Sequence, residues 1–366
     1  MIRVLQCVNN MHRAGLETML MNYYRSIDRS RIQFDFLTHR PFRSEYDDEI
    51  ESLGGRVYYA PRLYPQNYPA YFSYMKKFFA EHPEYRIVHS HIDTMSYLPL
   101  LAAKKAGVPV RIAHSHNTSI DRDLKYPLKL FFKSRLHTVL THRLSCGEDA
   151  GRFLFGDANF TVIPNAVDAS VFAFDESVRA RKRRELSLTD EFVVGHIGRM
   201  SYQKNHRFLL DAFKSLLRLR NDAVLMLIGN GEYEAELRTA AIDMGISERV
   251  RFLGSRSDVA ELYQAMDFFV LPSLFEGIPV VGVEAQFAGL PCLFSDAVPR
   301  EVAFTDGCRF IPLGAGADAW AEGIAVASAR NRSPDVSDSA YDIKNAHGFL
   351  EETYMSLYGE DLGIKV

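Results

Sequence analysis

Apolar and polar residues alternate along the chain in two series of short apolar runs, and segments with helical spacing separate the runs. The first series has apolar runs at residues 3–8, 33–37, 56–59, 86–89 and 110–113, with helical patterns that begin near residues 16, 47, 71 and 95. The second series has runs at residues 192–197, 223–228, 250–253, 268–271, 291–294 and 309–311. Strands that alternate with helices predict an α/β protein with doubly wound parallel sheets.

The alternation is interrupted once, by a polar stretch at residues 168–176 and a basic stretch after it. The interruption predicts two Rossmann-like domains, residues 1–168 and residues 169–344. At 366 residues, 47% of them apolar, the chain is long enough to give each domain its own core. A last helical pattern covers residues 345–358, and its apolar face contains Leu350, Tyr354, Leu357 and Tyr358.

Two glutamates follow the apolar run at residues 268–271. Pro279 predicts the first turn of a helix, so residues 273–278 are expected to form a strand-to-helix loop whose amides can bind an anion. Glu276 in this loop and Glu284 in the second helical turn can accept hydrogen bonds from hydroxyl groups around that anion. For an isolated pair of glutamates, a solvated surface remains the simpler explanation.

A second loop of the same kind strengthens the ligand hypothesis. The run at residues 192–197 leads into Gly198 and Arg199, then into Lys204, before the helical pattern at residues 208–219. A guanidinium can hold phosphate oxygens in a fork, and an ammonium can neutralise them as a point charge. Taken alone, these cations could equally be ordinary surface residues. A phosphate site flanked by groups that bind hydroxyls describes a nucleotide sugar.

Together the two loops resemble the retaining glycosyltransferases of family 4, which have the GT-B fold. The family has two glutamates in an E-G-x-P context, matched here by Glu276, Gly277, Pro279 and Glu284. Further matches are the Gly-Arg and Lys-Asn pattern at residues 198–205, the glycine turn at residues 228–232, and the segments at residues 250–254 and 163–168. The resemblance implies two Rossmann-like domains that face a cleft, with the final segment, residues 345–366, crossing back onto the first domain.

The resemblance also implies roles for individual residues. Arg199 and Lys204 would bind the diphosphate, Glu276 the hydroxyls of the donor sugar, and Glu284 the ribose. The base would lie near the backbone of Phe252 and Leu253. The remaining nucleotide-binding positions would be Gly15, Gly198, Gly229, Gly277, Ile278, Pro279 and Val280. Gly15 lies in a loop that resembles the family's G-G-x-E motif, although Ala14 replaces the first glycine and restricts positive φ.

Four histidines follow two neighbouring strands of the first domain: His89 and His91, then His114 and His116. The resemblance implies that a histidine at the second strand end faces the donor sugar, and the pattern favours His116, with His114 as the alternative. Four histidines could also suggest zinc, but the spacing gives no carboxylate or cysteine to complete a ligand set, so we expect no metal. The D-x-D sequence at residues 121–123 is interpreted as surface charge.

The composition excludes several other classes. The four cysteines show no metal-binding spacing, and no apolar run approaches the roughly 18–20 residues of a membrane span. The first residues form a strand pattern without a charged leader, so a cytoplasmic protein is expected. The basic run at residues 179–184 lacks interleaved aromatic residues, so we expect no nucleic-acid partner. The glycine turn after residue 228 is an incomplete dinucleotide motif, which argues against NAD.

The charge distribution suggests where an acceptor binds. Residues 1–168 carry a net positive charge, and the remainder carries a net negative charge. Residues 124–140 interleave cations with bulky apolar side chains and contain no acid, which is typical of a helix on an anionic membrane surface. An amphipathic helix packed on the sheet would have the same pattern. Peripheral attachment to the inner face of a membrane is therefore one of two interpretations.

The predicted function is retaining transfer of a sugar from a nucleotide-sugar donor to a saccharide or a lipid-linked acceptor, in the synthesis of a polysaccharide or glycolipid. The donor is expected to be a UDP-hexose or a UDP-N-acetylhexosamine, although nothing in the sequence distinguishes these from GDP-mannose. The nucleotide sugar is a co-substrate, and no cofactor is expected. Two alternatives remain: a sugar-nucleotide 2-epimerase with the GT-B fold, and a non-catalytic subunit that binds a sugar nucleotide.

Overall fold

The computed structural model describes all of the chain except residues 121–123, 327–331, 333–335, 362 and 364–366. The described chain forms two compact units. The first unit contains Met1–Ala166 and Ala340–Val366, and the second contains Val167–Ser339. The D-x-D sequence at residues 121–123 lies outside the described residues.

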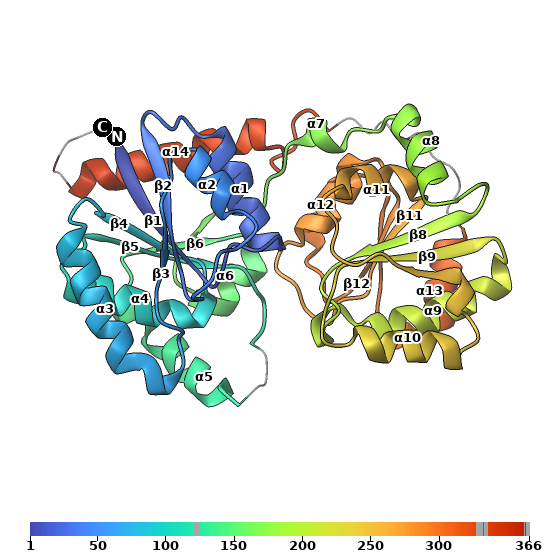
Figure 1. The fold of residues 1–366 in the computed structure, drawn as a ribbon, viewed down its shortest axis with the longest axis horizontal. Helices are drawn as coiled ribbons and strands as arrows, with labels where there is room; N and C mark the ends of the chain where they lie inside the picture. The colour runs from blue at the N-terminus through green and yellow to red at the C-terminus, as the bar shows by residue number, and fades with distance from the viewer. Residues whose placement is uncertain (121–123, 327–331, 333–335, 362, 364–366) are drawn as a thin grey trace. The chain divides into compact units, whose positions relative to one another are not determined.

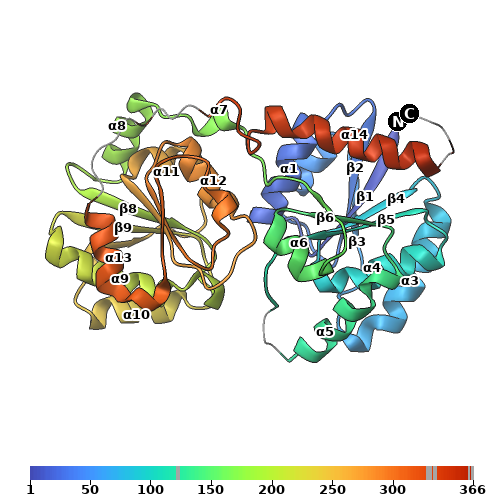
Figure 2. The ribbon, with the colours of Figure 1, turned by 180° about the vertical axis from the view of Figure 1, so that it is seen from behind.

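The first unit contains a seven-stranded sheet with the strand order β3-β2-β1-β4-β5-β6-β7, and every pair of neighbouring strands is parallel (Figures 1 and 2). The strands are β1 (Ile2–Val8), β2 (Ile32–Thr38), β3 (Val57–Tyr59), β4 (Ile87–Ser90), β5 (Val110–Ser115), β6 (His142–Ser145) and β7 (Thr161–Val162). The helices are α1 (Gly15–Ser26), α2 (Asp47–Ser52), α3 (Tyr68–Glu81), α4 (Tyr97–Lys105), α5 (Tyr126–Arg135), α6 (Glu148–Phe155) and α14 (Ile343–Asp361). The expected doubly wound sheet is confirmed, and β6 and β7 are strands that the apolar pattern did not predict.

The central strands of this sheet are buried along nearly their whole length because helices cover both faces. Every residue of β2 is buried, and Tyr24 of α1 stacks on Phe34 of β2 with ring centroids 5.4 Å apart. On the same strand, Asp35 is buried and accepts two hydrogen bonds of 2.6 Å from the guanidinium of Arg3. The buried charge is therefore paired, as a carboxylate inside a core must be.

The C-terminal helix α14 packs on the first unit, as the resemblance implied. Leu350, Tyr354 and Leu357 are buried. The ring of Tyr354 meets Phe34 edge to face at 5.8 Å, and Arg86, which precedes β4, donates a 2.7 Å hydrogen bond to the carboxylate of Asp361. The amphipathic face predicted at residues 345–358 is thus the face that contacts the sheet and α1.

The second unit contains a six-stranded parallel sheet with the strand order β10-β9-β8-β11-β12-β13. The strands are β8 (Phe192–Ile197), β9 (Ala223–Ile228), β10 (Val250–Phe252), β11 (Phe268–Leu271), β12 (Cys292–Ser295) and β13 (Cys308–Ile311). The helices are α7 (Ala169–Phe172), α8 (Glu176–Glu185), α9 (His206–Leu219), α10 (Glu234–Asp243), α11 (Val259–Ala265), α12 (Val280–Phe287) and α13 (Gly316–Ala325). All six strands expected in the second series are present.

Each sheet has one place where the strand order reverses. In the first unit the reversal lies between β1 and β4, and in the second between β8 and β11. At such a place the loops that follow the two strands turn to opposite faces and leave a crevice, where ligands of open α/β sheets bind. The predicted site residues lie at the ends of β1 and β5 in the first unit, where His89 and His91 at the end of β4 adjoin them, and at the ends of β8, β9, β10 and β11 in the second.

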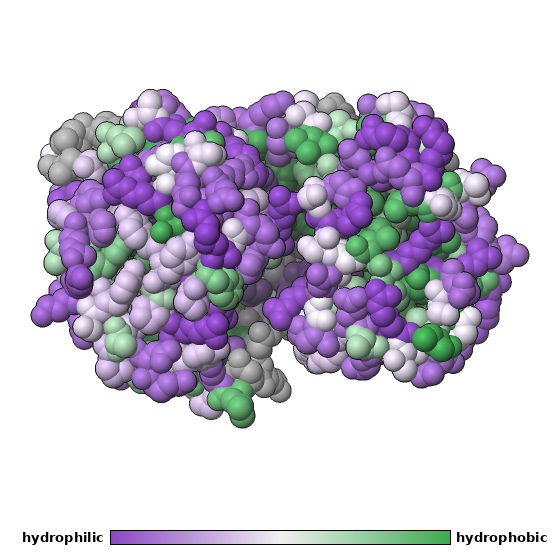
Figure 3. Space-filling view, viewed as in Figure 1, coloured by the Kyte–Doolittle hydropathy of each residue, from purple (hydrophilic) through white to green (hydrophobic). Residues whose placement is uncertain are grey.

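The segment predicted to lie on a membrane is shorter than expected: α5 ends at Arg135 and continues as a single 3₁₀ turn. Of this helix only Phe132 is buried, whereas Leu130, Phe131 and the preceding Leu124 are exposed. Figure 3 shows apolar surface beside α5 at the lower edge of the first unit. Among the described residues, none of the helices is both long and apolar enough to cross a membrane.

Candidate functional site

In the second unit, the loops after β8 and β11 are joined by hydrogen bonds at the point of strand reversal. The amide of Leu274 donates to the carbonyl of Gln203 at 2.8 Å. The side chain of Gln203 in turn donates to the carbonyl of Phe275 at 3.0 Å and to a carboxylate oxygen of Glu276 at 3.2 Å. The two predicted ligand loops therefore form one surface.

Lys204 and Glu276 meet on this surface. The Lys204 ammonium lies 2.6 Å from Oε1 of Glu276, and the two side chains are only 15% and 8% exposed. The stem of Lys204 passes over Gly198, where an added Cβ would lie 3.0 Å from Cε of the lysine. Three predicted site residues are thus brought together, and the positive charge of the lysine balances the carboxylate that faces it.

The glycine turn after β9 lies against the same loop. Gly229 has a φ of +128°, and an added Cβ would lie 2.2 Å from the carbonyl oxygen of Gly198, so only glycine fits. Arg199 is 74% exposed and forms an ion pair of 3.0 Å with Glu232. Unlike Lys204, the Arg199 guanidinium therefore lies at the open side of the loop.

Phe252 is the last residue of the edge strand β10, and Leu253 follows it. The Arg238 guanidinium lies 4.3 Å from the centre of the Phe252 ring, a cation–π contact. The amide of Leu253 donates to the carbonyl of Leu227 at 2.9 Å, so this amide belongs to the sheet. A base at this position would have to be recognised by other groups of the segment.

Glu284 lies on α12, whose first helical residue is Val280. Pro279 is the N-cap, one residue before the position expected from the sequence. Residues 276–280, which include Gly277, Ile278 and Pro279, are all buried where they enter the helix. Glu284 is also buried and accepts a 2.9 Å hydrogen bond from the hydroxyl of Tyr263 on α11. Burial raises the pKa of Glu284 to about 7, and the Tyr263 hydroxyl lowers it in part.

In the first unit, His116 directly follows β5 and is held from two sides. Its backbone amide donates to Asp93 at 2.8 Å, and its ring Nε2 lies 3.0 Å from Nδ1 of His91. Burial holds the pKa of the His116 ring below its usual range, so the ring is neutral at pH 7. His116 is the half-buried member of the histidine group, whereas His114 is fully buried.

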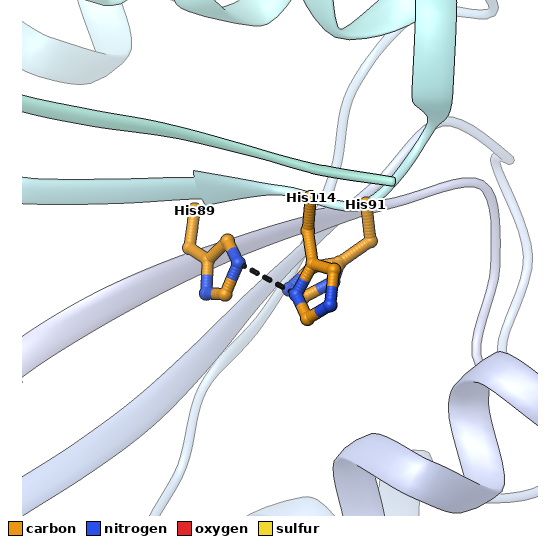
Figure 4. Close-up of side chains that lie close together, drawn as sticks. All are labelled: His89, His91 and His114. Carbon is orange, nitrogen blue, oxygen red and sulfur yellow. Dashed lines mark hydrogen bonds between the residues drawn. The ribbon is translucent and has the colours of Figure 1, made fainter. Parts of the chain in front are cut away.

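The other three histidines are more deeply buried than His116. Nε2 of His89 is 3.1 Å from Nδ1 of His114, and the two rings are nearly parallel (Figure 4). One ring nitrogen from each of His89, His91 and His114 lies within 4.8 Å of the others, close enough to consider a metal ion. Burial lowers the pKa values of all three rings well below the usual range, so the rings are neutral.

Gly15 is the first residue of α1, at the end of the loop after β1. Ala14 before it has an extended backbone with φ of −135°, a conformation that alanine adopts without strain. The replacement of the family glycine is therefore accommodated in this loop. Two residues further along the motif, Glu17 is buried, and burial raises its pKa to about 7.

Several residues of these sites escaped the sequence analysis. Gln203 could have been found, because it precedes Lys204 in the predicted loop. Tyr263 and Gln6 gave no signal, since each has the position of a core residue in its helix or strand, and Tyr354 was predicted only as part of the apolar face of the last helix. His196 and His206, which are buried beside each other with ring centroids 4.5 Å apart, were also missed.

Comparison with known proteins identifies the family. The profile "Glycosyltransferase Family 4" matches residues 13–171, and the profile "Glycosyl transferases group 1" matches residues 191–328. The chain is 36% identical over 368 residues to "Putative glycosyltransferase EpsF" of Bacillus subtilis (strain 168), with 96% of each chain covered. It is 34% identical over 225 residues, 58% of each chain, to the "UDP-Gal:alpha-D-GlcNAc-diphosphoundecaprenol alpha-1,3-galactosyltransferase" of Escherichia coli.

Solved structures agree on the fold. The structure of Anabaena Alr3699/HepE in complex with UDP and glucose superposes with a TM-score of 0.82 at 18% identity, covering 97% of this chain and 100% of the other. The structure of WaaG, "a glycosyltransferase involved in lipopolysaccharide biosynthesis", gives a TM-score of 0.71 at 16% identity and covers 95% of each chain. With both halves matched by family profiles and a relative similar over nearly the whole length, the chain belongs to the family 4 glycosyltransferases, which transfer sugars and have the GT-B fold.

Proposed function

We propose that the protein is a metal-independent hexosyltransferase that retains the anomeric configuration of a UDP-linked donor. The observation that carries the proposal is the joined pair of loops in the second unit, where Lys204 contacts Glu276 and Glu284 follows on the adjoining helix. This arrangement offers one cation for a diphosphate and two carboxylates for hydroxyls. UDP is favoured over GDP because the Alr3699/HepE structure holds UDP and the Escherichia coli relative is named for UDP-Gal.

The proposed roles follow from charge and burial. The bond between the anomeric carbon and the diphosphate breaks in the reaction, and negative charge accumulates on the leaving group. Lys204 and Arg199 neutralise that charge, and electrostatic stabilisation of this kind usually lowers the barrier more than any other single effect. Glu276 accepts hydrogen bonds from hydroxyls of the sugar, and Glu284 accepts them from the ribose. His116 contacts the donor sugar, and the base lies near Phe252 and Leu253.

The acceptor is proposed to be lipid-linked, in the synthesis of a polysaccharide or glycolipid. The Escherichia coli relative is named for a diphosphoundecaprenol acceptor, and another relative, from Staphylococcus aureus, is named for capsular polysaccharide biosynthesis. In this chain, α5 exposes Leu130 and Phe131, and a hollow of about 400 Å³ between α5 and α6 has Lys133, His137 and Arg143 among its lining residues. Apolar surface beside cations suits a membrane that contains anionic lipid.

The first prediction concerns the reaction. Incubation with an α-linked UDP-hexose or UDP-N-acetylhexosamine and a lipid-linked acceptor extract is expected to release UDP and give an α-linked product, and NMR of the fresh product assigns the linkage. EDTA is expected to leave the rate intact. A β-linked product would contradict retention. Interconversion of UDP-GlcNAc and its 2-epimer without an acceptor would instead identify an epimerase, and donor binding without UDP release from any acceptor would identify a non-catalytic subunit.

The second prediction concerns the two cations. Arg199→Ala and Lys204→Ala are each expected to lower kcat by about 10²-fold or more, since removal of one group that stabilises charge in the transition state costs about 3 kcal/mol. Steady-state kinetics measure the effect. Arg218→Ala is the matched control, because Arg218 is also exposed and ion-paired, with Asp318 on α13. Near-wild-type rates in both site variants would contradict the assignment.

The third prediction uses the raised pKa of Glu284, which is about 7 in the folded protein and 4.5 in an unfolded chain. Below pH 4.5 the carboxyl is protonated in both states. Between pH 4.5 and 7 only the unfolded chain loses the proton, so this residue's contribution to stability is lost as pH rises, by at most about 3 kcal/mol. Glu284→Gln is therefore expected to raise Tm relative to the wild type more at pH 8 than at pH 5.

The control for this measurement is Tyr263→Phe, which removes the hydroxyl that favours the ionised carboxylate. In that variant the folded pKa of Glu284 should rise, so the stability difference from the Glu284→Gln, Tyr263→Phe double variant should still begin near pH 4.5 but continue to grow to a higher pH. An equal Tm difference between wild type and Glu284→Gln at both pH values would show that Glu284 titrates normally.

The fourth prediction concerns membrane attachment. The protein is expected to float with liposomes that contain anionic lipid at low salt, and to lose binding at high salt. The same loss is expected when the cations of α5 and of its N-cap are changed to Gln: Lys125, Lys129, Lys133 and Arg135. The charge-matched control changes four exposed lysines of α3 and α4 to Gln: Lys76, Lys77, Lys104 and Lys105. Binding that is absent, or equal in both variants, would favour a soluble acceptor.

A further inference from the structure

The buried histidines of the first unit form a hydrogen-bonded network that begins at Gln6. Gln6 lies on β1 beside His89 of β4 and is fully buried. Its Oε1 lies 2.8 Å from Nε2 of His91, and its Nε2 donates to the hydroxyl of Tyr354 at 3.1 Å. The network thus joins the first strand to the C-terminal helix α14.

The first arm of the network consists of the hydrogen bonds between Gln6 and His91 and between His91 and His116. It determines which ring nitrogen of each histidine carries the proton. An amide oxygen only accepts hydrogen bonds, so His91 carries its proton on Nε2. Because the buried ring is neutral, Nδ1 of His91 is a bare acceptor. Nε2 of His116, 3.0 Å away, must then donate to it. His116 is left with its proton on Nε2 and a bare Nδ1.

The second arm of the network leads from Gln6 through Tyr354 and His89 to His114. The Tyr354 hydroxyl accepts from Gln6, and its other hydrogen-bond partner among the described residues is Nδ1 of His89 at 2.6 Å. We therefore assign the hydroxyl proton to the bond with His89, because a buried donor needs an acceptor. Nε2 of His89 then donates to Nδ1 of His114 at 3.1 Å (Figure 4). The last proton is on Nε2 of His114, which has no hydrogen-bond partner within the described part of the chain. The backbone of Ser145 raises the pKa of this ring and so partly offsets the effect of burial.

A metal ion is the other interpretation of this cluster, since ring nitrogens of His89, His91 and His114 lie within 4.8 Å of one another. In neutral imidazole only the nitrogen without a proton can bind a metal. In this network the bare nitrogen of each of the three rings is its Nδ1, and each Nδ1 already accepts a hydrogen bond. A metal would have to replace three hydrogen bonds, so the geometry favours the hydrogen-bonded form.

We propose that His91 is a positioning residue that acts through His116. Gln6 holds His91, and His91 in turn fixes His116 as the Nε2–H tautomer. Nδ1 of His116 is then free of a proton and accepts a hydrogen bond from a hydroxyl of the donor sugar. The specificity consequence is that the sugar must present a hydroxyl to this ring. The proposal rests on the proposed function for the part that concerns the sugar, and on the network alone for the tautomer.

Two isosteric variants separate positioning from packing. In His91→Asn the amide oxygen can occupy the place of Nδ1 and still accept from His116, whereas the bond to Gln6 is lost. In His91→Gln the amide nitrogen can occupy the place of Nε2 and still donate to Gln6, whereas the acceptor for His116 is lost. Each variant forfeits one buried hydrogen bond, so a structural role alone predicts equal losses in Tm and in kcat.

The expected result is a kcat for His91→Gln about tenfold or more below that of His91→Asn, with the donor KM changing less than kcat. Long-range ¹H–¹⁵N correlation spectra of the wild type, with signals assigned by the variants, are expected to show His89, His91, His114 and His116 as neutral Nε2–H tautomers at pH 7. His116 should keep this tautomer in His91→Asn and lose it in His91→Gln.

Three outcomes would overturn the proposal: equal kcat values for the two variants of an active enzyme, a proton on Nδ1 of His116 in the wild type, or one equivalent of tightly bound metal whose removal changes the histidine spectra. The spectra need no substrate. A wild type that transfers no sugar but shows the expected tautomers would therefore contradict the proposed function and leave the network standing.

Discussion

A parallel sheet covered by helices on both faces keeps few polar side chains within its strands, and those that it keeps, such as Asp35, need a partner inside the core. In both units the central strands are buried along nearly their whole length, so the backbone of each strand is satisfied by its neighbours and the side chains supply the core. Chemistry is therefore confined to the carboxyl ends of the strands. The strand order reverses between β1 and β4 and between β8 and β11, and most candidate site residues lie near these two places, whereas Phe252 and Leu253 lie at the edge strand β10.

A second constraint acts on the polar groups at these edges, because a buried charge or donor is costly unless it has a partner. Three different solutions occur here. Lys204 and Glu276 neutralise each other, Glu284 accepts from Tyr263 with a raised pKa, and the four histidines remain neutral and share their protons in a fixed direction. Each solution also determines what the group can offer a ligand: a charge, a carboxylate that ionises near neutral pH, or an acceptor.

The strands of the second unit and the two loops with Glu276 and Lys204 could be predicted from the sequence. In these segments the apolar runs are strong, and glycine or proline residues mark where loops begin and end. The sequence did not predict β6, whose sequence His142–Ser145 is short and mostly polar, since a strand near the sheet edge needs few apolar positions. Pro279 was placed one residue too far into its helix, because proline fits both the N-cap and the first helical position and the pattern does not separate the two.

Hydrogen-bond partners that are far apart along the chain could not be predicted from the sequence. Gln6 and Tyr354 are 348 positions apart and look like ordinary core residues of an amphipathic strand and helix. The same holds for Tyr263, which becomes the partner of Glu284 only when α11 and α12 pack together. The histidine pairs were visible as pairs, but their direction of proton donation depends on Gln6, which no spacing rule selects.

The pairing of Lys204 with Glu276 bears on how a donor would bind. In the protein without a donor, the two nearly buried side chains cancel each other's charge, so the loop surface carries no isolated charge that would have to be desolvated. A diphosphate that approaches Lys204 competes with Glu276 for the ammonium, and the carboxylate can then accept from sugar hydroxyls. Under the proposed roles, diphosphate and sugar hydroxyls would assist each other: a nucleotide alone would draw the lysine's charge away from Glu276, and a sugar alone would find Glu276 occupied. One ion pair would then be enough to favour a complete nucleotide sugar over either of its parts.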